Sequence, residues 1–174
     1  MRRFACLLTA LLLALGSTAL AEAPAPLDAE DFTLTYQGVT YRLGEDAAPL
    51  LAAMTAADGA EPAVFEAESC LFDGMDKEYT GAELLVATCP TGKGGADQLE
   101  TLVLLAGAYT TARGIGLGAS LADVEAAYGT DYTRDGIELT YALGDPLSDP
   151  ILIFTLDAKD DTVVELLMMN NTGF

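Results

Sequence analysis

The stretch LGASLADVEAAYG, residues 117–129, decides the fold class because it combines the start and stop signals of a helix with one apolar face. Ser120 is a natural N-cap, and Asp123 three residues later resembles the second member of a capping box, with Asp in place of Glu. Apolar side chains then recur at i, i+3 and i+7, at Leu121, Val124 and Tyr128. Gly129 ends the pattern, so the spacing predicts an amphipathic helix packed on a core.

A second helix is predicted 74 residues earlier, where Leu43-Gly44 occupies the position of Leu117-Gly118. Two acidic residues follow Gly44, where they favour the positive end of a helix, and Pro49 is tolerated in the first turn. We expect this helix to end before Gly59. Self-similarity at a fixed offset indicates two related units that bury a shared core.

Segments with the alternation of strands surround both predicted helices. After the first helix, strands are predicted at 63–72, 82–88 and 99–106, separated by the turn-rich stretches DGMDKEYTG and PTGKGGADQ. After the second helix, strands are predicted at 132–134, 137–143, 151–156 and 162–169. Ahead of the first helix, residues 32–36 and 39–43 fit two short strands or one bulged strand.

The order of these elements predicts an α+β fold. Each half of the chain carries a helix and an antiparallel meander, so we expect two tandem repeats, residues 31–107 and 108–174. The chain has 174 residues and is 51% hydrophobic, which is enough for a core of its own. Both repeats are therefore expected to form one globular unit.

The N-terminus has the three parts of a secretory signal peptide. Arg2 and Arg3 precede an apolar run over residues 4–15, and Ala19 and Ala21 form a small-x-small cleavage pattern. The run is too short to cross a bilayer comfortably. We expect residues 1–21 to be removed, residues 22–30 to form an extended leader, and the mature protein to be secreted or otherwise extracytoplasmic, on the cell-envelope side, without a transmembrane segment.

The charge of the chain excludes two classes of partner. It carries 27 acidic and 8 basic residues, a formal net charge of −19, and removal of the signal would take two of the basic ones. Nucleic acids and anionic membranes require a basic face, so neither is expected as a partner. The acidity favours solubility and cationic partners, although dispersed acids would simply be solvated and only a clustered patch would indicate a partner.

Few residues could support catalysis. The sequence has no histidine, which removes Ser-His and Cys-His activation and imidazole metal ligation. No serine is followed by a lysine three residues later, and no acidic loop has the spacing of a calcium-binding loop. Paired carboxylates remain as a route to hydrolysis. We expect no enzyme, no catalytic residue, no cofactor and no metal site.

The two cysteines that would remain after cleavage, Cys70 and Cys89, are predicted to form a disulfide. Acidic neighbours of Cys70 disfavour its thiolate, which argues against a catalytic thiol. If a hairpin is centred near Tyr79 and Thr80, positions 70 and 89 fall opposite one another.

Two stretches resemble a known family. TTARGIGLGASLADVEAAYG, residues 110–129, resembles the "rGI.iG.s..dV...yG" start of a helix in secreted, mostly uncharacterised proteins of clostridia-like bacteria. ESCLFDGMDKEYTGAELLVAT, residues 68–88, resembles their "SC.f.G.dk.Y" hairpin. The arrangement of two helix-plus-meander repeats is also similar to the fold of β-lactamase inhibitory proteins. The resemblance implies the fold but no activity, because no inhibitory contact residue can be matched here.

The leading functional hypothesis is a secreted, non-catalytic binding module with an unknown partner, such as an extracellular or envelope protein. It would use the exposed face of its sheet, with Tyr109, Tyr132 and Tyr141 as candidate aromatic anchors. Strand alternation favours core packing for Tyr141. The alternatives are an envelope-associated structural domain and a carboxylate-dependent secreted hydrolase. An exposed tyrosine patch would favour the first hypothesis, a convex and uniformly acidic surface the second, and a deep pocket with two carboxylates the third.

Overall fold

A computed structural model describes residues 23–92 and 94–171. Its elements are a 3-10 turn (Ala29–Phe32), β1 (Thr33–Tyr36), β2 (Val39–Arg42), α1 (Ala48–Asp58), β3 (Ala63–Glu68), β4 (Met75–Thr80), β5 (Leu84–Pro90), β6 (Asp97–Leu104), α2 (Leu121–Tyr128), β7 (Thr133–Asp135), β8 (Glu138–Ala142), β9 (Ile151–Leu156) and β10 (Val163–Met169). The predicted α+β class is confirmed. The predicted signal peptide lies outside the described residues.

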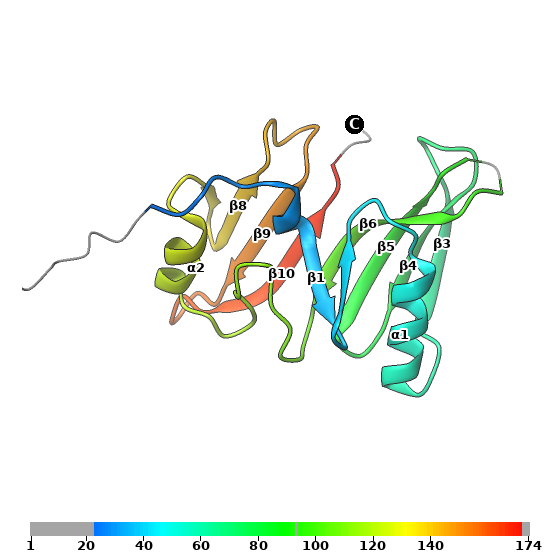
Figure 1. The fold of residues 1–174 in the computed structure, drawn as a ribbon, viewed down its shortest axis with the longest axis horizontal. Coiled ribbons are helices and arrows are strands. Elements are labelled where there is room, and N and C mark those ends of the chain that lie inside the picture. The colour runs from blue at the N-terminus through cyan, green and yellow to red at the C-terminus, as the bar shows by residue number, and fades with distance from the viewer. Residues whose placement is uncertain (1–22, 93, 172–174) are drawn as a thin grey trace, which may run out of the picture.

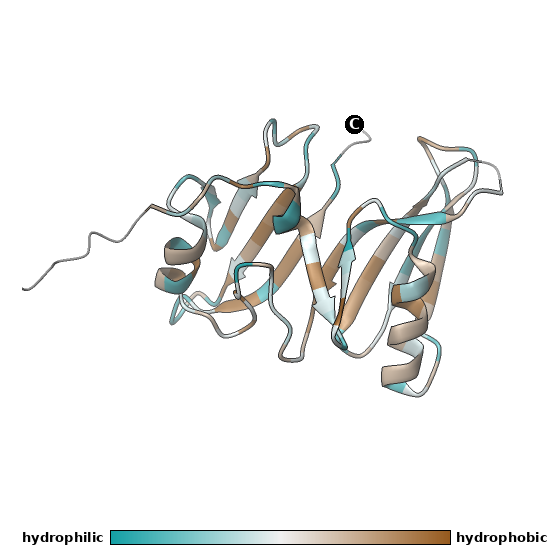
Figure 2. Ribbon diagram, viewed as in Figure 1, coloured by the Kyte–Doolittle hydropathy of each residue, from teal (hydrophilic) through white to brown (hydrophobic). Residues whose placement is uncertain are grey.

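The fold has two layers. Strands β3 to β10 form one antiparallel sheet in the order β3-β4-β5-β6-β10-β9-β8-β7, and β1 and β2 form a separate hairpin. Both helices and this hairpin lie on the same side of the large sheet (Figure 1). Their apolar side chains close a single core with alternate residues of the central strands, where hydropathy is highest (Figure 2). Neither helix in the described part of the chain is long and apolar enough to span a bilayer.

The helix ends follow the sequence signals. Ser120 Oγ accepts a hydrogen bond from the Asp123 amide at 3.2 Å, and Asp123 Oδ2 accepts one from the Ser120 amide at 2.9 Å, which completes the predicted capping box. Gly129 and Gly59 are the C-caps of α2 and α1. Leu50 of α1 and Val124 of α2 are fully buried, and they pack the two helices against the core.

The centre of the sheet is the antiparallel pair of β6 and β10. Val103 lies opposite Leu167, and the pairs on either side are Leu104 with Leu166 and Leu102 with Met168. Both strands contain one extra residue near their start, Glu100 in β6 and Val164 in β10. Such β-bulges bend a strand locally. The pairing of β6 with β10 therefore has approximate twofold symmetry: the register and the position of the bulge stay nearly the same when the two strands are interchanged.

The connection into each helix is also made in the same way in both halves. Gly44 donates to the Leu99 carbonyl at 2.7 Å, and the Leu99 amide donates to the Glu45 carbonyl at 2.8 Å. In the second half, Gly118 donates to the Val163 carbonyl at 2.7 Å, and the Val163 amide donates to the Ala119 carbonyl at 2.8 Å. The φ angles of the two glycines are 82° and 83°, a left-handed conformation that favours glycine.

One predicted turn is a strand. The stretch DGMDKEYTG was expected to be a turn, but residues 75–80 form β4 and pair with both β3 and β5. This segment has a glycine on either side and four polar or charged residues, which is a composition typical of turns. A strand can have it here because β4 is only half buried. The hairpin that follows β4 turns at residues 81–83 and not near Tyr79 and Thr80.

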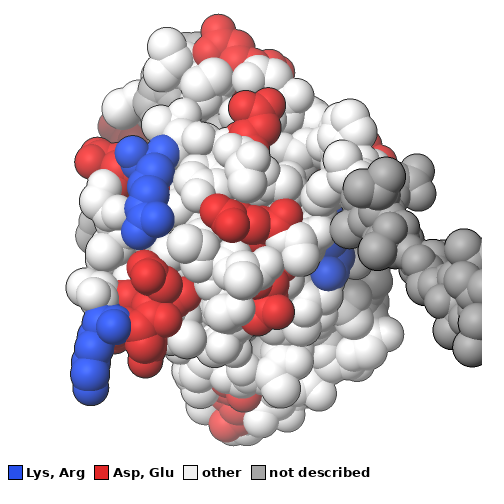
Figure 3. All heavy atoms as spheres, turned by 90° about the vertical axis from the view of Figure 1, so that its left-hand side faces the viewer, with Lys and Arg blue, Asp and Glu red and all other residues white. Residues whose placement is uncertain are grey.

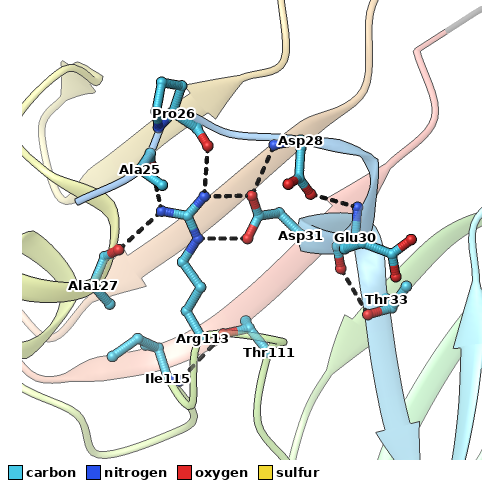
Figure 4. Close-up of polar contacts among 10 residues, drawn as sticks. All are labelled: Ala25, Pro26, Asp28, Glu30, Asp31, Thr33, Thr111, Arg113, Ile115 and Ala127. Atoms are coloured by element: carbon cyan, nitrogen blue, oxygen red, sulfur yellow. Dashed lines mark hydrogen bonds and ion pairs between the residues drawn. The ribbon is translucent and has the colours of Figure 1, made fainter.

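The expected leader, residues 22–30, is described from residue 23, enters a 3-10 turn at Ala29 and is anchored to the rest of the chain. Arg113 donates hydrogen bonds to the backbone carbonyls of Ala25 and Pro26, and to the carboxylate of Asp31 (Figure 4). The Asp31 side chain in turn accepts from the Asp28 amide at 2.9 Å. The segment over residues 25–31 is thereby held against the second half of the chain, beside α2.

Candidate functional site

The sheet has one face that no described helix or hairpin covers, here called the open face. It consists of the side chains that alternate with the buried ones along each strand. Across the four central strands, successive partners on this face are Leu85, Val103, Leu167 and Ile153. This row is named the open-face stripe. It is apolar from end to end although it has no packing partner in the described part of the chain.

A second row runs beside the stripe. It pairs Ala87 with Thr101, Thr101 with Met169, and Met169 with Ile151. Ile151 and Val103 are only 7% and 8% exposed, so these two side chains contribute little accessible surface to the open face. Apart from Thr101, the side chains of both rows are apolar, and a large apolar patch on a soluble monomer usually has a function.

A cavity of about 330 Å³ lies at the β3–β4 end of this surface. Its apolar walls are Phe65, Ala67, Leu71, Phe72, Ala87 and Met169. The connection between β3 and β4 carries Leu71 and Phe72, which are 55% and 42% exposed, and Phe65 on β3 is 68% exposed. Large apolar side chains are thus gathered around an opening rather than packed into the core.

Three acidic residues also line the cavity, Asp76, Glu78 and Glu100, and we call it the acidic cavity. Oδ1 of Asp76 is buried and has no hydrogen-bond partner among the residues that the structure describes. Burial raises the pKa of the Glu100 carboxyl, and the negative charge of Asp76 raises it further. Lys77 is the basic residue of the lining, but its ammonium group bonds Asp97 at 2.7 Å. The cavity is therefore electronegative.

Cys89 completes the lining as a protonated thiol. Its Sγ donates to Glu100 Oε2 at 3.6 Å. Burial, together with the charge of Glu100, raises the pKa of Cys89 to about 11. A thiol with this pKa is a poor nucleophile near neutral pH.

The predicted disulfide between Cys70 and Cys89 is absent, and both are free thiols. The register behind that prediction is wrong, because β4 lies between the strand that precedes Cys70 and the strand that contains Cys89. By strand pairing, the neighbour of Cys89 on β6 is Gln98. Cys70 lies in the exposed connection that follows β3.

The three candidate tyrosine anchors do not form a patch on the open face. Tyr141 is 1% exposed and donates its hydroxyl to the Gly129 carbonyl at 2.8 Å. Tyr132 packs on Tyr141 and donates to Glu125. Tyr109 packs on Tyr36 with ring centroids 4.7 Å apart and donates to Glu83 at 2.6 Å. All three side chains pack on the core side of the sheet and lie outside the open face.

Asp76 and Glu100 were missed at the level of sequence. In a chain with 27 acidic residues, nothing marks two of them as partners in a cavity. Leu71-Phe72 beside Gly74 was the available signal, because two large apolar residues are unusual in a turn.

Acidic side chains on one other side of the molecule are dispersed. On the side of the molecule that carries α2, they lie in separate groups among uncharged residues (Figure 3). Most described basic residues are already in ion pairs, namely Arg42, Lys77, Arg113 and Arg134. The acidic cavity differs from such a surface, because its carboxylates are gathered beside a concave apolar wall.

A comparison of the chain with protein-family models, curated proteins and solved structures finds no match. The function is therefore inferred from the chemistry of the open face.

Proposed function

We propose that the protein is a secreted, non-catalytic binding module whose open face receives a protein partner. The observation that carries this proposal is the open-face stripe, four apolar side chains in register across the central strands. The two helices and the β1–β2 hairpin all lie on the opposite face, so the described part of the chain provides no cover for it. The secreted location rests on the predicted signal over residues 1–21.

The rim of the open face suggests the charge of the partner. Acidic residues border the apolar rows on both sides, with Asp76 and Glu78 on β4, and Glu138 and Glu165 toward β8 and β10. An apolar centre with a polar rim is the usual anatomy of a protein interface. A partner with apolar side chains flanked by basic ones would complement this surface.

We further propose that the open face is built from two tandem repeats, residues 31–107 and 108–174, with a fold similar to β-lactamase inhibitory proteins. The clostridial secreted proteins would be relatives. Support comes from the paired bulges at Glu100 and Val164, and from the matched hydrogen bonds of Gly44 and Gly118. Four strands follow each helix in the structure.

The test is capture of a partner with residues 22–174 from the envelope and medium fractions of the native culture. Ile153→Lys and Leu85→Lys place a cation on the open-face stripe, and Val39→Lys places one on the β1–β2 hairpin, where Val39 is 53% exposed. We expect Val39→Lys to retain a partner that both stripe variants lose by tenfold or more at moderate salt. Equal capture by all three variants would overturn the proposal. Capture of nothing would favour the envelope-associated structural domain.

A carboxylate-dependent hydrolase is the second candidate. The acidic cavity favours it, because Asp76 and Glu100 lie in one apolar site and burial raises the pKa of Glu100. Its test is turnover of a panel of glycosides and esters by the wild type and Glu100→Gln. Activity that is lost in Glu100→Gln and kept in Glu138→Gln would support a hydrolase, and no turnover would eliminate it for those substrates.

A further inference from the structure

We propose that the acidic cavity receives a guanidinium group, carried by an arginine side chain of the protein partner that docks on the open face. This inference rests on the proposed function and adds the chemistry that anchors the partner at one end of the sheet. Four observations carry it: the apolar walls, the unpartnered carboxylate oxygen, the absence of a free cation among the described residues of the lining, and a braced loop.

The walls require an occupant with an apolar stem. Phe65, Phe72 and Met169 face a cavity of about 330 Å³, which is at the small end of the range for ligand pockets. The three methylene groups of an arginine can lie against such walls while its charged head reaches inward. Phe65 and Phe72 also offer aromatic rings, on which guanidinium groups stack.

The interior requires a hydrogen-bond donor. Asp76 Oδ1 is buried without a partner, although buried carboxylate oxygens are nearly always bonded. The Glu100 carboxylate accepts a long contact from the Cys89 thiol, at 3.6 Å, and the Asn170 side chain is also near enough to lower its pKa. Lys77 does not serve either group, because Asp97 holds its ammonium at 2.7 Å. A donor brought by a partner would serve the carboxylates of the lining, and a rotation of the Asp76 side chain would bring its buried oxygen within reach.

Guanidinium fits this site better than the other common cations. A calcium ion takes six to eight oxygen ligands, whereas this cavity has apolar walls. A lysine ammonium is compact and strongly hydrated, so its transfer into an apolar cavity is costly. Guanidinium is planar and weakly hydrated, and its five N–H donors can serve two carboxylates at once.

The outer wall of the cavity is held in place before any ligand binds. Ser69 Oγ accepts hydrogen bonds from the amides of Leu71 and Phe72, at 3.3 and 3.2 Å. The Ser69 amide donates to the Gly74 carbonyl at 3.0 Å. These bonds fix the connection in which Leu71 and Phe72 are displayed, so little ordering remains for the binding step.

The experiment titrates residues 22–174 with N-acetyl-L-arginine amide and follows methionine methyl signals by NMR. Met169 lines the cavity, and Met168 points into the core on the opposite face, which makes it an internal control. The neutral isostere is N-acetyl-L-citrulline amide, and N-acetyl-L-lysine amide tests the ammonium. We expect a saturable shift at Met169 for arginine, at least tenfold weaker binding of citrulline, and weaker binding of lysine.

Isosteric variants locate the charge requirement. Asp76→Asn and Glu100→Gln should each weaken arginine binding about tenfold, and Glu61→Gln, in the connection between α1 and β3, should leave it unchanged. Equal binding of arginine and citrulline, or no shift at Met169, would overturn the guanidinium site. If a partner is nevertheless captured in a manner that depends on Ile153 and Leu85, the proposed function stands alone. If arginine binds but no such partner is captured, the guanidinium site stands and the proposal of a protein partner on the open face is overturned.

Discussion

Arg113 and Asp31, 82 residues apart in the chain, face each other through two N–H···O bonds of 2.6 Å. The Asp31 side chain is 4% exposed and that of Arg113 is 18% exposed, so the pair is largely withdrawn from water. The same guanidinium donates to the Ala127 carbonyl at the end of α2 and lies 4.9 Å from the centre of the Tyr128 ring. One side chain therefore joins the leader, the start of β1 and the second helix.

Removal of this guanidinium should be strongly destabilising. Arg113→Ala leaves a buried carboxylate without its partner, and we expect a loss of about 3 kcal/mol in the free energy of unfolding. Arg113→Lys should lose less, because it keeps the charge but not the paired geometry. Urea denaturation provides the measurement. Arg42→Ala, which breaks an ion pair with the exposed Glu30, is the control and should cost less than about 1 kcal/mol. Similar losses for Arg113→Ala and Arg42→Ala would contradict this account.

The two glycines that lead into the helices should respond alike to substitution. An added Cβ at Gly118 meets nothing within 4 Å, and one at Gly44 meets only Asn170 Nδ2, at 4.0 Å. The cost of Gly44→Ala and Gly118→Ala is therefore backbone strain, about 1 to 2 kcal/mol each. Asparagine tolerates the left-handed region, so the corresponding Asn variants should lose less. Thermal or urea unfolding measures both series, and an unequal response of the two sites would argue against equivalent roles.

Glu100 gives stability a specific pH dependence. Its folded pKa is raised above the ordinary value of 4.5, so the native state holds this proton more tightly than the unfolded state. Through the interval between these two pKa values, stability falls as pH rises. Glu100→Gln should therefore be more stable than the wild type at pH 7.5, and this gain should vanish below the ordinary pKa of a glutamate. Comparison of urea midpoints at pH 7.5 and below that pKa tests this, with Glu138→Gln as the control. Lower stability of Glu100→Gln at pH 7.5 would show that the charge is favourable.

The two thiols should differ in reactivity. Cys70 is exposed, whereas the pKa of Cys89 is raised from 9.0 to about 11, which lowers its thiolate fraction near neutral pH about 100-fold. Brief iodoacetamide treatment of folded residues 22–174 should label Cys70 and spare Cys89, as mass spectrometry of the peptides would show. Both should react in urea. If neither cysteine reacts until a reductant is added, a disulfide joins them after all.

Local signals account for the parts of the fold that were predicted correctly. The start of α2 depends on Ser120 and Asp123, which lie three residues apart and need no distant partner. Strand β9 depends on a continuous apolar run, and its observed bounds equal the predicted ones. Such features depend on residues that are close together in the sequence, so they can be predicted without knowledge of the tertiary contacts.

The missed features depend on contacts between distant segments. Met75–Thr80 becomes a strand because β3 and β5 supply partners on both sides, which its polar composition does not indicate. The acidic cavity combines Asp76 from β4 with Glu100 from β6 and Met169 from β10. The open-face stripe follows from the register of four strands, since a shift by one residue would turn its side chains into the core.

Arg113 holds carbonyl oxygens that lie 88 and 87 residues before it, on Ala25 and Pro26. Closing so long a loop costs chain entropy that later contacts must offset, so the segment over residues 25–31 should settle after the second half has folded. In a chain that crosses a membrane with its N-terminus first, residues 25–31 would emerge early but would form their contacts with Arg113 last. For the secreted protein that we propose, the interval between arrival and closure would be the time in which a signal-cleaving enzyme could reach that end of the protein.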